Sequence, residues 1–355
     1  MHGEPEVVDP IAELITNYNE LNPAAVEELY EEPSPLEFMR FVTRNTPFVV
    51  RGAAADWEAT RKWNVGFIKD SLRGETVNVA VTPQGNADSP TRHNDGTLVF
   101  AKPWEEQQPI DKFLDYVIAQ ERAALAKPAG EVRYAQTQND NLRHEYATLF
   151  KDVQRDVPFA RIALGAASGP DAINLWIGNS RSVTALHRDN YENLYVQVAG
   201  RKRFVLLPPH CQPCVNEQLL PPADYVRSSS SSSMTQTTTA DRYPSLLGLE
   251  LVKPEEAEEA VPFPTWDPDL PDQNSTAYSG LAEPLRVTLE PGDMLYLPCM
   301  WYHKVSQSCS AEGICVAVNY WYDMDFRGPL YPLSMFIRSV NSQKRCGRQN
   351  PGHGI

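Results

Sequence analysis

Two histidines and one aspartate have the residue types and spacing of a metal site: His187 and Asp189 stand two apart, and His303 lies far downstream. On an extended segment, residues two apart point to the same face, so His187 and Asp189 can bind one ion together. Two imidazoles and one carboxylate form the facial triad that holds Fe(II) and leaves the opposite positions open for a co-substrate and oxygen. A His-X-Asp pair alone also arises by chance, and a lone histidine is more often structural. With a strand that brings His303 alongside, the pattern predicts an iron-dependent oxygenase.

The same region offers partners for a co-substrate, and 2-oxoglutarate is the common one for iron oxygenases. Its distal carboxylate needs a fixed cation together with hydroxyl or amide donors. Lys202 is a candidate cation, Thr184 stands three residues before His187, and Asn193 has the strand parity of the two paired ligands. Arginines flank Lys202 on both sides, so an ordinary basic turn is the alternative interpretation of that lysine.

A predicted strand at 314–322 gives an independent indication of a pocket. Cys315, Ala317, Asn319 and Trp321 share one parity of this strand. A buried asparagine needs hydrogen-bond partners, and its neighbours on this face include small side chains. Lining a pocket therefore explains Asn319 better than packing does.

The elements that must position these residues are short strands. From about residue 132 the sequence changes to β-runs separated by turns. We expect strands at 133–138, 173–177, 193–198, 203–207, 286–289, 294–297 and 314–322. The third and fourth are expected to form one hairpin, and the fifth and sixth a second. Many short strands with few helices between them predict a mainly β protein with peripheral helices, built as an antiparallel barrel or jelly roll.

The chain divides into three predicted parts. Residues 1–131 form an extension packed on the barrel, with helices in the first thirty residues, at 35–43 and at 110–126, and strands at 47–51 and 77–82. Residues 132–327 form the barrel and carry a low-complexity Ser/Thr insertion at about 228–240, which we expect to be disordered. The stretch around this insertion is expected to be irregular. Residues 328–355 are a tail with a helix at 331–340, whose apolar face is either core or, as we favour, the surface of a homodimer.

The composition is that of an acidic globular protein, with 355 residues, 42% of them hydrophobic and 22% charged, and a net charge of −14. No apolar run approaches the ~18 residues of a membrane span, and the acidic start is unlike a signal peptide, so we expect a cytoplasmic or nuclear protein. The charge disfavours nucleic-acid binding and suits a basic protein partner, although many acidic proteins have none.

Six cysteines in a chain without a secretory signal predict no disulfides. Cys211 and Cys214 form the one local pair, and no second CxxC exists to complete a zinc site. They follow two prolines and do not open a helix of a βαβ unit, so we expect loop cysteines without a metal or redox role.

Several motifs resemble the Jumonji-C (JmjC) hydroxylases. The segments that carry the resemblance are 174–178, 184–195, 200–209, 290–298, 301–303 and 318–324, with 47–52, Trp63 and 79–83 outside the barrel. The resemblance covers nearly the whole chain and is weakest in the Ser/Thr insertion and beyond about Arg338. It implies a double-stranded β-helix, also called a cupin-like jelly roll. It also implies Fe(II) and 2-oxoglutarate as cofactor and co-substrate, with O₂ as oxidant.

The resemblance assigns roles to residues already singled out. It implies that iron is held by His187, Asp189 and His303. Lys202 and Thr184 would hold the distal carboxylate of 2-oxoglutarate. The implied remaining contacts of the co-substrate pocket are Asn193, Asn319, Trp321 and Tyr134.

The activity implied by the resemblance is hydroxylation at C3 of a lysine in a protein substrate, a GTP-binding protein of the developmentally regulated family. The iron and co-substrate residues do not separate this from an N-methyl-lysine demethylase, because demethylation begins with hydroxylation of the N-methyl carbon. Small size and the absence of reader modules favour the hydroxylase. A catalytically inactive peptide-binding barrel is a further alternative. A zinc-dependent cupin isomerase is another, but it would leave Lys202 and Asn319 without a shared role.

Overall fold

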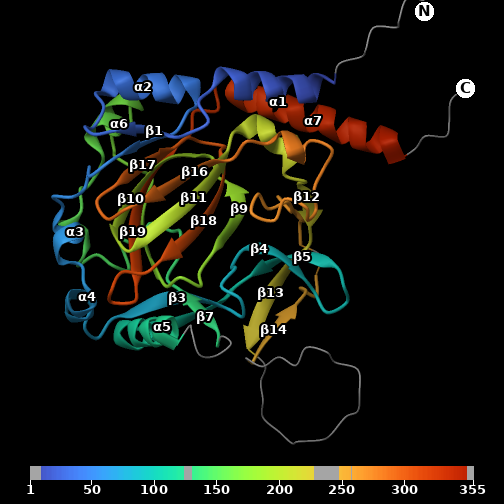
Figure 1. Cartoon of the computed structure of the whole chain (residues 1–355). Helices are drawn as coiled ribbons and strands as arrows, with labels where there is room; N and C mark the ends of the chain where they lie inside the picture. The colour runs from blue at the N-terminus through green and yellow to red at the C-terminus, as the bar shows by residue number, and fades with distance from the viewer. Residues whose placement is uncertain (1–8, 124–129, 228–247, 257, 350–355) are drawn as a thin grey trace, which may run out of the picture.

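Two facing β-sheets form the centre of the molecule in the computed structural model, which describes residues 9–123, 130–227, 248–256 and 258–349 (Figure 1). The large sheet has the order β1-β2-β17-β10-β19-β8, and the small sheet has the order β16-β11-β18-β9. The strands of the barrel itself are β8 (Ala172–Gly178), β9 (Thr184–Arg188), β10 (Tyr191–Ala199), β11 (Arg201–Leu207), β16 (Leu285–Leu289), β17 (Met294–Leu297), β18 (Tyr302–Ser308) and β19 (Cys315–Asp323). This mainly β architecture confirms the predicted double-stranded β-helix.

The chain crosses between the sheets at nearly every step. Strands β8, β10, β17 and β19 belong to the large sheet, whereas β9, β11, β16 and β18 form the small one. Thus β10 pairs with β17 and β19, and β11 with β16 and β18. Both predicted hairpins are therefore wrong in their pairing, although all four strands are present. A tight turn between two apolar runs looks the same in sequence whether the chain folds back within one sheet or crosses to the facing one.

Burial on two faces explains why the central strands are apolar throughout. All of β19 except its last residue is buried. Its residues Val316, Val318 and Tyr320 pack in the outer core, whereas Ala317 packs inside the barrel. The two parities of this strand thus face two different environments, and the parity of Asn319 faces the interior of the barrel.

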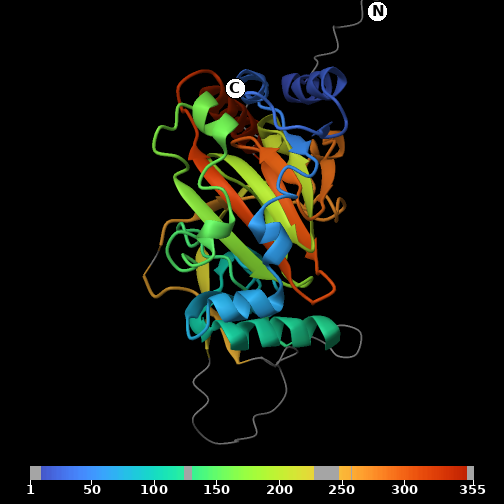
Figure 2. The same ribbon diagram turned by 90° about the vertical axis from the view of Figure 1, so that its left-hand side faces the viewer.

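The N-terminal part covers the outer face and the ends of the barrel. Its elements are α1 (Pro10–Leu21), β1 (Glu27–Leu29), α2 (Pro35–Arg44), β2 (Phe48–Val50), α3 (Glu58–Lys62), α4 (Val65–Ser71), β3 (Thr76–Thr82), β4 (Ser89–Arg92), β5 (Leu98–Lys102), β6 (Trp104–Pro109), α5 (Ile110–Ala123) and β7 (Val132–Tyr134). Strand β2 extends the large sheet by pairing with β17. Phe38 of α2 packs edge-on against Tyr296 of β17 and Phe159 of α6 (Pro158–Ala163). Figure 2 shows α5 across the end of the barrel opposite to α1.

Local sequence signals account for these helices. Ser34 caps α2 with the reciprocal bonds of a capping box to Glu37, as predicted. The face of α5 that contains Ile110, Phe113 and Val117 is buried. The strand predicted at 133–138 is shorter, because only Ala135 continues beyond β7, through an isolated bridge to β8. The boundary predicted at residue 131 stays a prediction, since the extension and the barrel share one sheet.

The segment between β11 and β16 is more regular than the sequence suggested. It contains η2 (Pro209–Cys214), β12 (Gln218–Leu220), β13 (Pro222–Arg227), β14 (Leu249–Val252), β15 (Val261–Phe263) and η3 (Ser279–Leu281). Strand β13 pairs with β5 of the N-terminal part, and β12 pairs with β15. The expected irregular stretch is therefore wrong outside the Ser/Thr insertion, which lies outside the described residues. The expectation of a loop at Cys211 and Cys214 is also wrong, because both are buried in a 3-10 helix.

The C-terminal helix α7 (Leu330–Gln349) lies beside α1 at one end of the barrel (Figure 1). Val340 packs against the cluster formed by α1 and η2, whereas Leu333 and Phe336 remain 57% and 64% exposed. The helix is thus partly core and partly exposed apolar surface, and the predicted homodimer stays a prediction. Within the described residues, no helix is long and apolar enough to cross a membrane.

Candidate metal centre and substrate pocket

The small sheet brings the three predicted ligands together. His187 on β9 lies directly opposite His303 on β18 in the antiparallel register, and their ring centroids are 4.1 Å apart. Asp189 is the first residue after β9. One of its carboxylate oxygens, Oδ2, is 3.6 Å from Nε2 of each histidine. The ligand atoms of all three residues lie within 4.8 Å of one another, so together they can hold one metal ion.

Backbone carbonyls orient both imidazoles toward this point. Nδ1 of His187 is 2.9 Å from the carbonyl oxygen of Ala185, and Nδ1 of His303 is 3.1 Å from that of Trp301. A carbonyl only accepts, so each Nδ1 carries the proton and each Nε2 presents its lone pair. The amide of Met300 donates to the carbonyl of Asp189 at 2.7 Å and anchors the backbone beyond β9.

The electrostatics of the triad favour a neutral His303 and an ionised Asp189. Burial and the neighbouring His187 lower the pKa of His303 to about 4, so its imidazole is neutral at pH 7. Burial pushes the pKa of Asp189 upward, but the two imidazoles outweigh it and bring that pKa to about 2. Burial likewise disfavours charge on His187, yet Asp189 raises its pKa. A carboxylate beside a neutral imidazole is the state that binds a cation.

A β-bulge explains why Thr184 faces the same cavity as His187. In a regular strand, residues three apart point to opposite faces. The register of β9 against β18 shifts between His303 and Val305. His303 pairs with His187 and Val305 pairs with Thr184, so a step of two residues along β18 matches a step of three residues along β9. The extra residue returns Thr184 to the face of His187, and both line the cavity.

Lys202 lines this cavity as a buried cation. Its side chain is 2% exposed, and Nζ donates to the hydroxyl of Tyr134 at 2.8 Å. Burial lowers the pKa of Lys202 to about 8. No carboxylate of the described residues forms an ion pair with it. A buried ammonium without a counter-ion is costly, so this position suits a ligand that brings a carboxylate.

Amide and indole groups complete the wall of the cavity. Trp176 donates through Nε1 to Oδ1 of Asn319 at 2.8 Å, and Asn319 donates through Nδ2 to Oδ1 of Asn193 at 3.1 Å. Trp321 stacks on Tyr191 at 4.6 Å, and its buried Nε1 has no hydrogen-bond partner among the described residues. This orphaned donor lines the same cavity as the triad and suits a ligand with oxygen acceptors.

All nine predicted site residues therefore lie in one place. Sequence reasoning missed Trp176, Gln138 and Tyr195, which line the same cavity. It also missed the role of Gly178, where a Cβ would come within 2.6 Å of the ring of Tyr134. The sequence did contain a signal for Trp176 and Gly178. Both belong to the segment 174–178 that resembles the JmjC hydroxylases, and they share one strand parity, so they point to the same face of β8.

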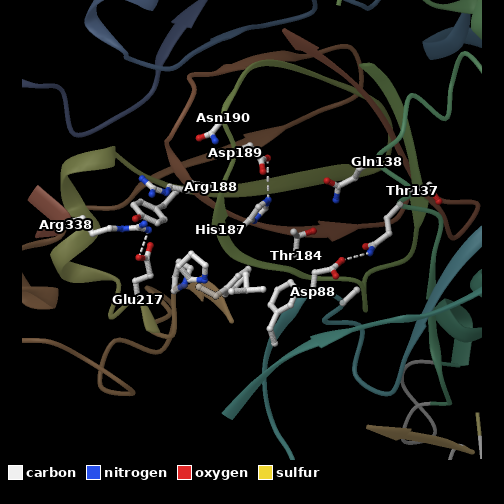
Figure 3. Close-up of a pocket in the computed structure, with 18 of the residues that line it drawn as sticks. Asp88, Thr137, Gln138, Thr184, His187, Arg188, Asp189, Asn190, Glu217 and Arg338 are labelled. Carbon is white, nitrogen blue, oxygen red and sulfur yellow. Dashed lines mark hydrogen bonds and ion pairs between the residues drawn. The ribbon is translucent and has the colours of Figure 1, made fainter. Parts of the chain in front are cut away.

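A wider cavity of about 640 Å³ opens in front of the triad (Figure 3). Arg188 lies on one side of it, over the ring of Tyr302, and close by Arg338 of α7 forms an ion pair with Glu217. Asp88 lies on another side and accepts a hydrogen bond from Gln136 at 3.1 Å. The cavity is wide enough for a side chain of another molecule to reach the metal ligands.

The donor set and the pocket fit the cofactor and co-substrate that the sequence implied. Two imidazole nitrogens and one carboxylate oxygen on one side of a point form the facial triad of non-haem iron sites. The buried cation Lys202 and the orphaned donor of Trp321 match the carboxylate and oxygen groups of 2-oxoglutarate. In the part of the chain that the structure describes, no other group of three or more His, Cys, Asp or Glu residues has metal-binding geometry.

Two facing sheets that enclose such a triad define the cupin class of metal-binding barrels. The chain belongs to the JmjC family of this class: residues 33–328 match the family described as "Cupin-like domain", and relatives named for JmjC activities align over most of the chain. This family comprises protein hydroxylases and demethylases.

Three relatives illustrate the similarity. The human bifunctional peptidase and (3S)-lysyl hydroxylase JMJD7 is 37% identical over 305 residues, covering 86% of each chain. The lysine-specific demethylase JMJ32 of Arabidopsis thaliana is 35% identical over 311 residues, covering 85% of this chain and 82% of that protein. The JmjC domain-containing protein E of Dictyostelium discoideum is 30% identical over 337 residues and 91% of each chain.

Proposed function

We propose that this chain is an Fe(II)- and 2-oxoglutarate-dependent protein oxygenase that hydroxylates C3 of a lysine. The observation that carries the proposal is the convergence of the His187, Asp189 and His303 ligand atoms within 4.8 Å, with the buried cation Lys202 lining the same cavity. The name of the human relative, a (3S)-lysyl hydroxylase, supports lysine as the residue and C3 as the atom.

Each part of the site has a task under this proposal. His187, Asp189 and His303 would bind Fe(II), which when bound supplies oxygen activation coupled to oxidative decarboxylation of 2-oxoglutarate. Lys202 and the hydroxyls of Tyr134 and Thr184 would fix the distal carboxylate. Because the hydroxyl of Tyr134 accepts from Lys202, its own proton remains available for that carboxylate.

The remaining residues would shape the pocket around the co-substrate. Asn193, Asn319 and Trp321 offer hydrogen-bonding groups along its length. Trp176 and Phe204 line this pocket with apolar surface, which excludes water from it. A dry, pre-formed pocket holds the co-substrate in one orientation and leaves the wide cavity for the protein substrate.

The substrate that the family resemblance favours is a GTP-binding protein of the developmentally regulated family. The test is mass spectrometry of that protein after incubation with this chain, Fe(II), 2-oxoglutarate and oxygen. We expect one added oxygen on a lysine. Asp189→Ala abolishes the product because it removes a metal ligand, whereas Asp272→Ala, at an exposed aspartate, leaves it unchanged.

The Arabidopsis relative's name makes N-methyl-lysine demethylation the competing activity. Release of formaldehyde from methylated lysine peptides, with no oxygen retained on lysine, would favour the demethylase. Full activity in Asp189→Ala would contradict the assignment of the triad.

We also propose a cytoplasmic or nuclear location and a homodimer that forms through Leu333 and Phe336 of α7. The mass of the protein in solution tests the homodimer.

A further inference from the structure

Two carboxylates in the wide cavity have no task in the proposed chemistry. Asp88 precedes β4 and Glu105 lies on β6, and both line the cavity in front of the triad. Figure 3 shows Asp88 on the wall of this cavity, and its carboxylate accepts a hydrogen bond from Gln136. No cation of the described residues forms an ion pair with either carboxylate. The carboxylate of Glu217 elsewhere on the cavity wall differs, because it is paired with Arg338.

The surroundings of Asp88 favour an incoming cation. Burial raises the pKa of Asp88, and the like charge of Glu105 raises it further. Asp88 also lines a second cavity of about 410 Å³, together with Glu105, Asp224 and Lys102, whose ammonium is already paired with Glu258. Negative charges that line one cavity repel, and a positive ligand group relieves that repulsion.

Apolar side chains lie on the same cavity wall. The rings of Phe100 and Phe263 are 5.1 Å apart, and both line the cavity with Val261, Pro262 and Pro264. An apolar wall beside a carboxylate matches one protein side chain in particular. Lysine buries its methylene stem against apolar surface and keeps an ammonium at its tip.

We infer that Asp88 receives the ε-ammonium of an unmethylated target lysine, with Glu105 adding to the field, and that the Phe100–Phe263 wall holds the stem. This inference rests on the proposed function and names the residue that selects its substrate. The nitrogen of lysine lies four bonds from C3, so it must be held away from the ligands while C3 faces them. Asp88, on the cavity wall outside the triad, provides that anchor. In demethylation the nitrogen instead lies one bond from the oxidised carbon.

Peptide binding tests this role without turnover. Peptides with a fixed central lysine and randomised flanks are selected on the full chain under anaerobic conditions, with Fe(II) and 2-oxoglutarate. The best binder is then remade with norleucine or Nε-trimethyl-lysine at the centre, and dissociation constants are measured with and without the metal. We expect lysine to bind at least about tenfold more tightly than norleucine, as for a close ion pair. Trimethyl-lysine is also expected to bind more weakly than lysine, since it has no N–H to donate.

Asp88→Asn is the decisive variant. Asp88 has a φ of 52°, a conformation that asparagine tolerates well, and the amide oxygen can still accept from Gln136. We expect this variant to lose the preference for lysine over norleucine and to bind the norleucine peptide as the wild type does. Asp70→Asn makes the same charge change at an exposed site on α4, and it should retain the full preference.

Two results would overturn the inference: an equal preference for lysine in Asp88→Asn and in the wild type, or no lysine preference in the wild type at all. Calorimetric titration of the metal-loaded wild type with 2-oxoglutarate is run alongside. A failure of that titration would count against the proposed function, whereas lost lysine selectivity with intact 2-oxoglutarate binding would count against Asp88 alone.

Discussion

At the scale of one residue, the buried charge of Lys202 lowers the stability of the ligand-free protein. A charged lysine that is 2% exposed, without a carboxylate partner among the described residues, opposes folding. Its pKa of about 8 in the folded chain, against an ordinary value of 10.5, corresponds to a cost of about 3 kcal/mol. The hydrogen bond to Tyr134 offsets part of this cost. A residue that only supported the fold would not need this charge.

Lys202→Met should therefore stabilise the ligand-free protein by about 1–2 kcal/mol at pH 7, less than the full cost because Tyr134 loses its donor. Since burial lowers the pKa of this lysine, the folded state loses the proton first as the pH rises. The wild type thus gains stability between about pH 8 and 10.5, and the advantage of the variant shrinks there. Urea unfolding of both proteins across this pH range measures the difference in their free energies of unfolding.

The same variant should no longer be stabilised by 2-oxoglutarate, because the co-substrate loses its cation. Arg203→Met, at the exposed neighbour on β11, is the control and should change stability by no more than about 0.5 kcal/mol. If Lys202→Met still gave a full thermal shift with 2-oxoglutarate, this lysine would not hold the co-substrate.

At the scale of elements, the corner between β10 and β11 depends on Gly200. Its φ is 71°, and a Cβ there would lie 2.6 Å from the carbonyl oxygen of Ser308. The chain must turn sharply here because it leaves one sheet for the facing one. A side chain at this corner would collide with backbone, which cannot move aside as a flexible side chain can.

Gly200→Ala should accordingly destabilise the fold by about 2–4 kcal/mol, from the sum of left-handed strain and overpacking. Gly165 has a similar φ of 66° with nothing within 4 Å of its Cβ position, so Gly165→Ala isolates the backbone strain and should cost about 1 kcal/mol. Denaturant midpoints of the two variants measure the difference. Equal losses would mean that the corner has room for a side chain.

The elements also show what the sequence could and could not predict. Strand positions follow from local apolar runs, so six of the eight barrel strands and the helices α1, α2, α5 and α7 were predicted, whereas β9 and β18, which carry the two histidines, were not. Pairing depends on contacts between distant segments, and for that reason the two sheet crossings were mistaken for hairpins. The bulge that turns Thr184 toward His187 leaves no mark in the residue pattern. The triad was predictable because its ligand types restrict the chemistry more strongly than its spacing does.

At the scale of the whole molecule, the net charge of −14 acts together with the acidic cavity. The carboxylates that line the two neighbouring cavities (Asp88, Glu105, Asp189, Glu217 and Asp224) outnumber the cations there (Lys102, Arg188 and Arg338), so the surface and the site carry net charge of the same sign. A basic substrate should be attracted over a distance that salt shortens, from about 30 Å at 0.01 M to about 8 Å at 0.15 M ionic strength. An acidic surface of this kind acts mainly on the rate of encounter.

The association rate of a basic lysine peptide should therefore fall roughly tenfold as the ionic strength rises from about 0.01 M to about 0.3 M. A matched peptide whose flanking Lys and Arg residues are replaced by Gln keeps the central lysine but loses the long-range attraction, so its rate should change little. Stopped-flow fluorescence with both peptides measures this directly. The same salt dependence for both peptides would show that the overall charge does not steer the substrate, and selectivity would then depend on contacts inside the cavity alone.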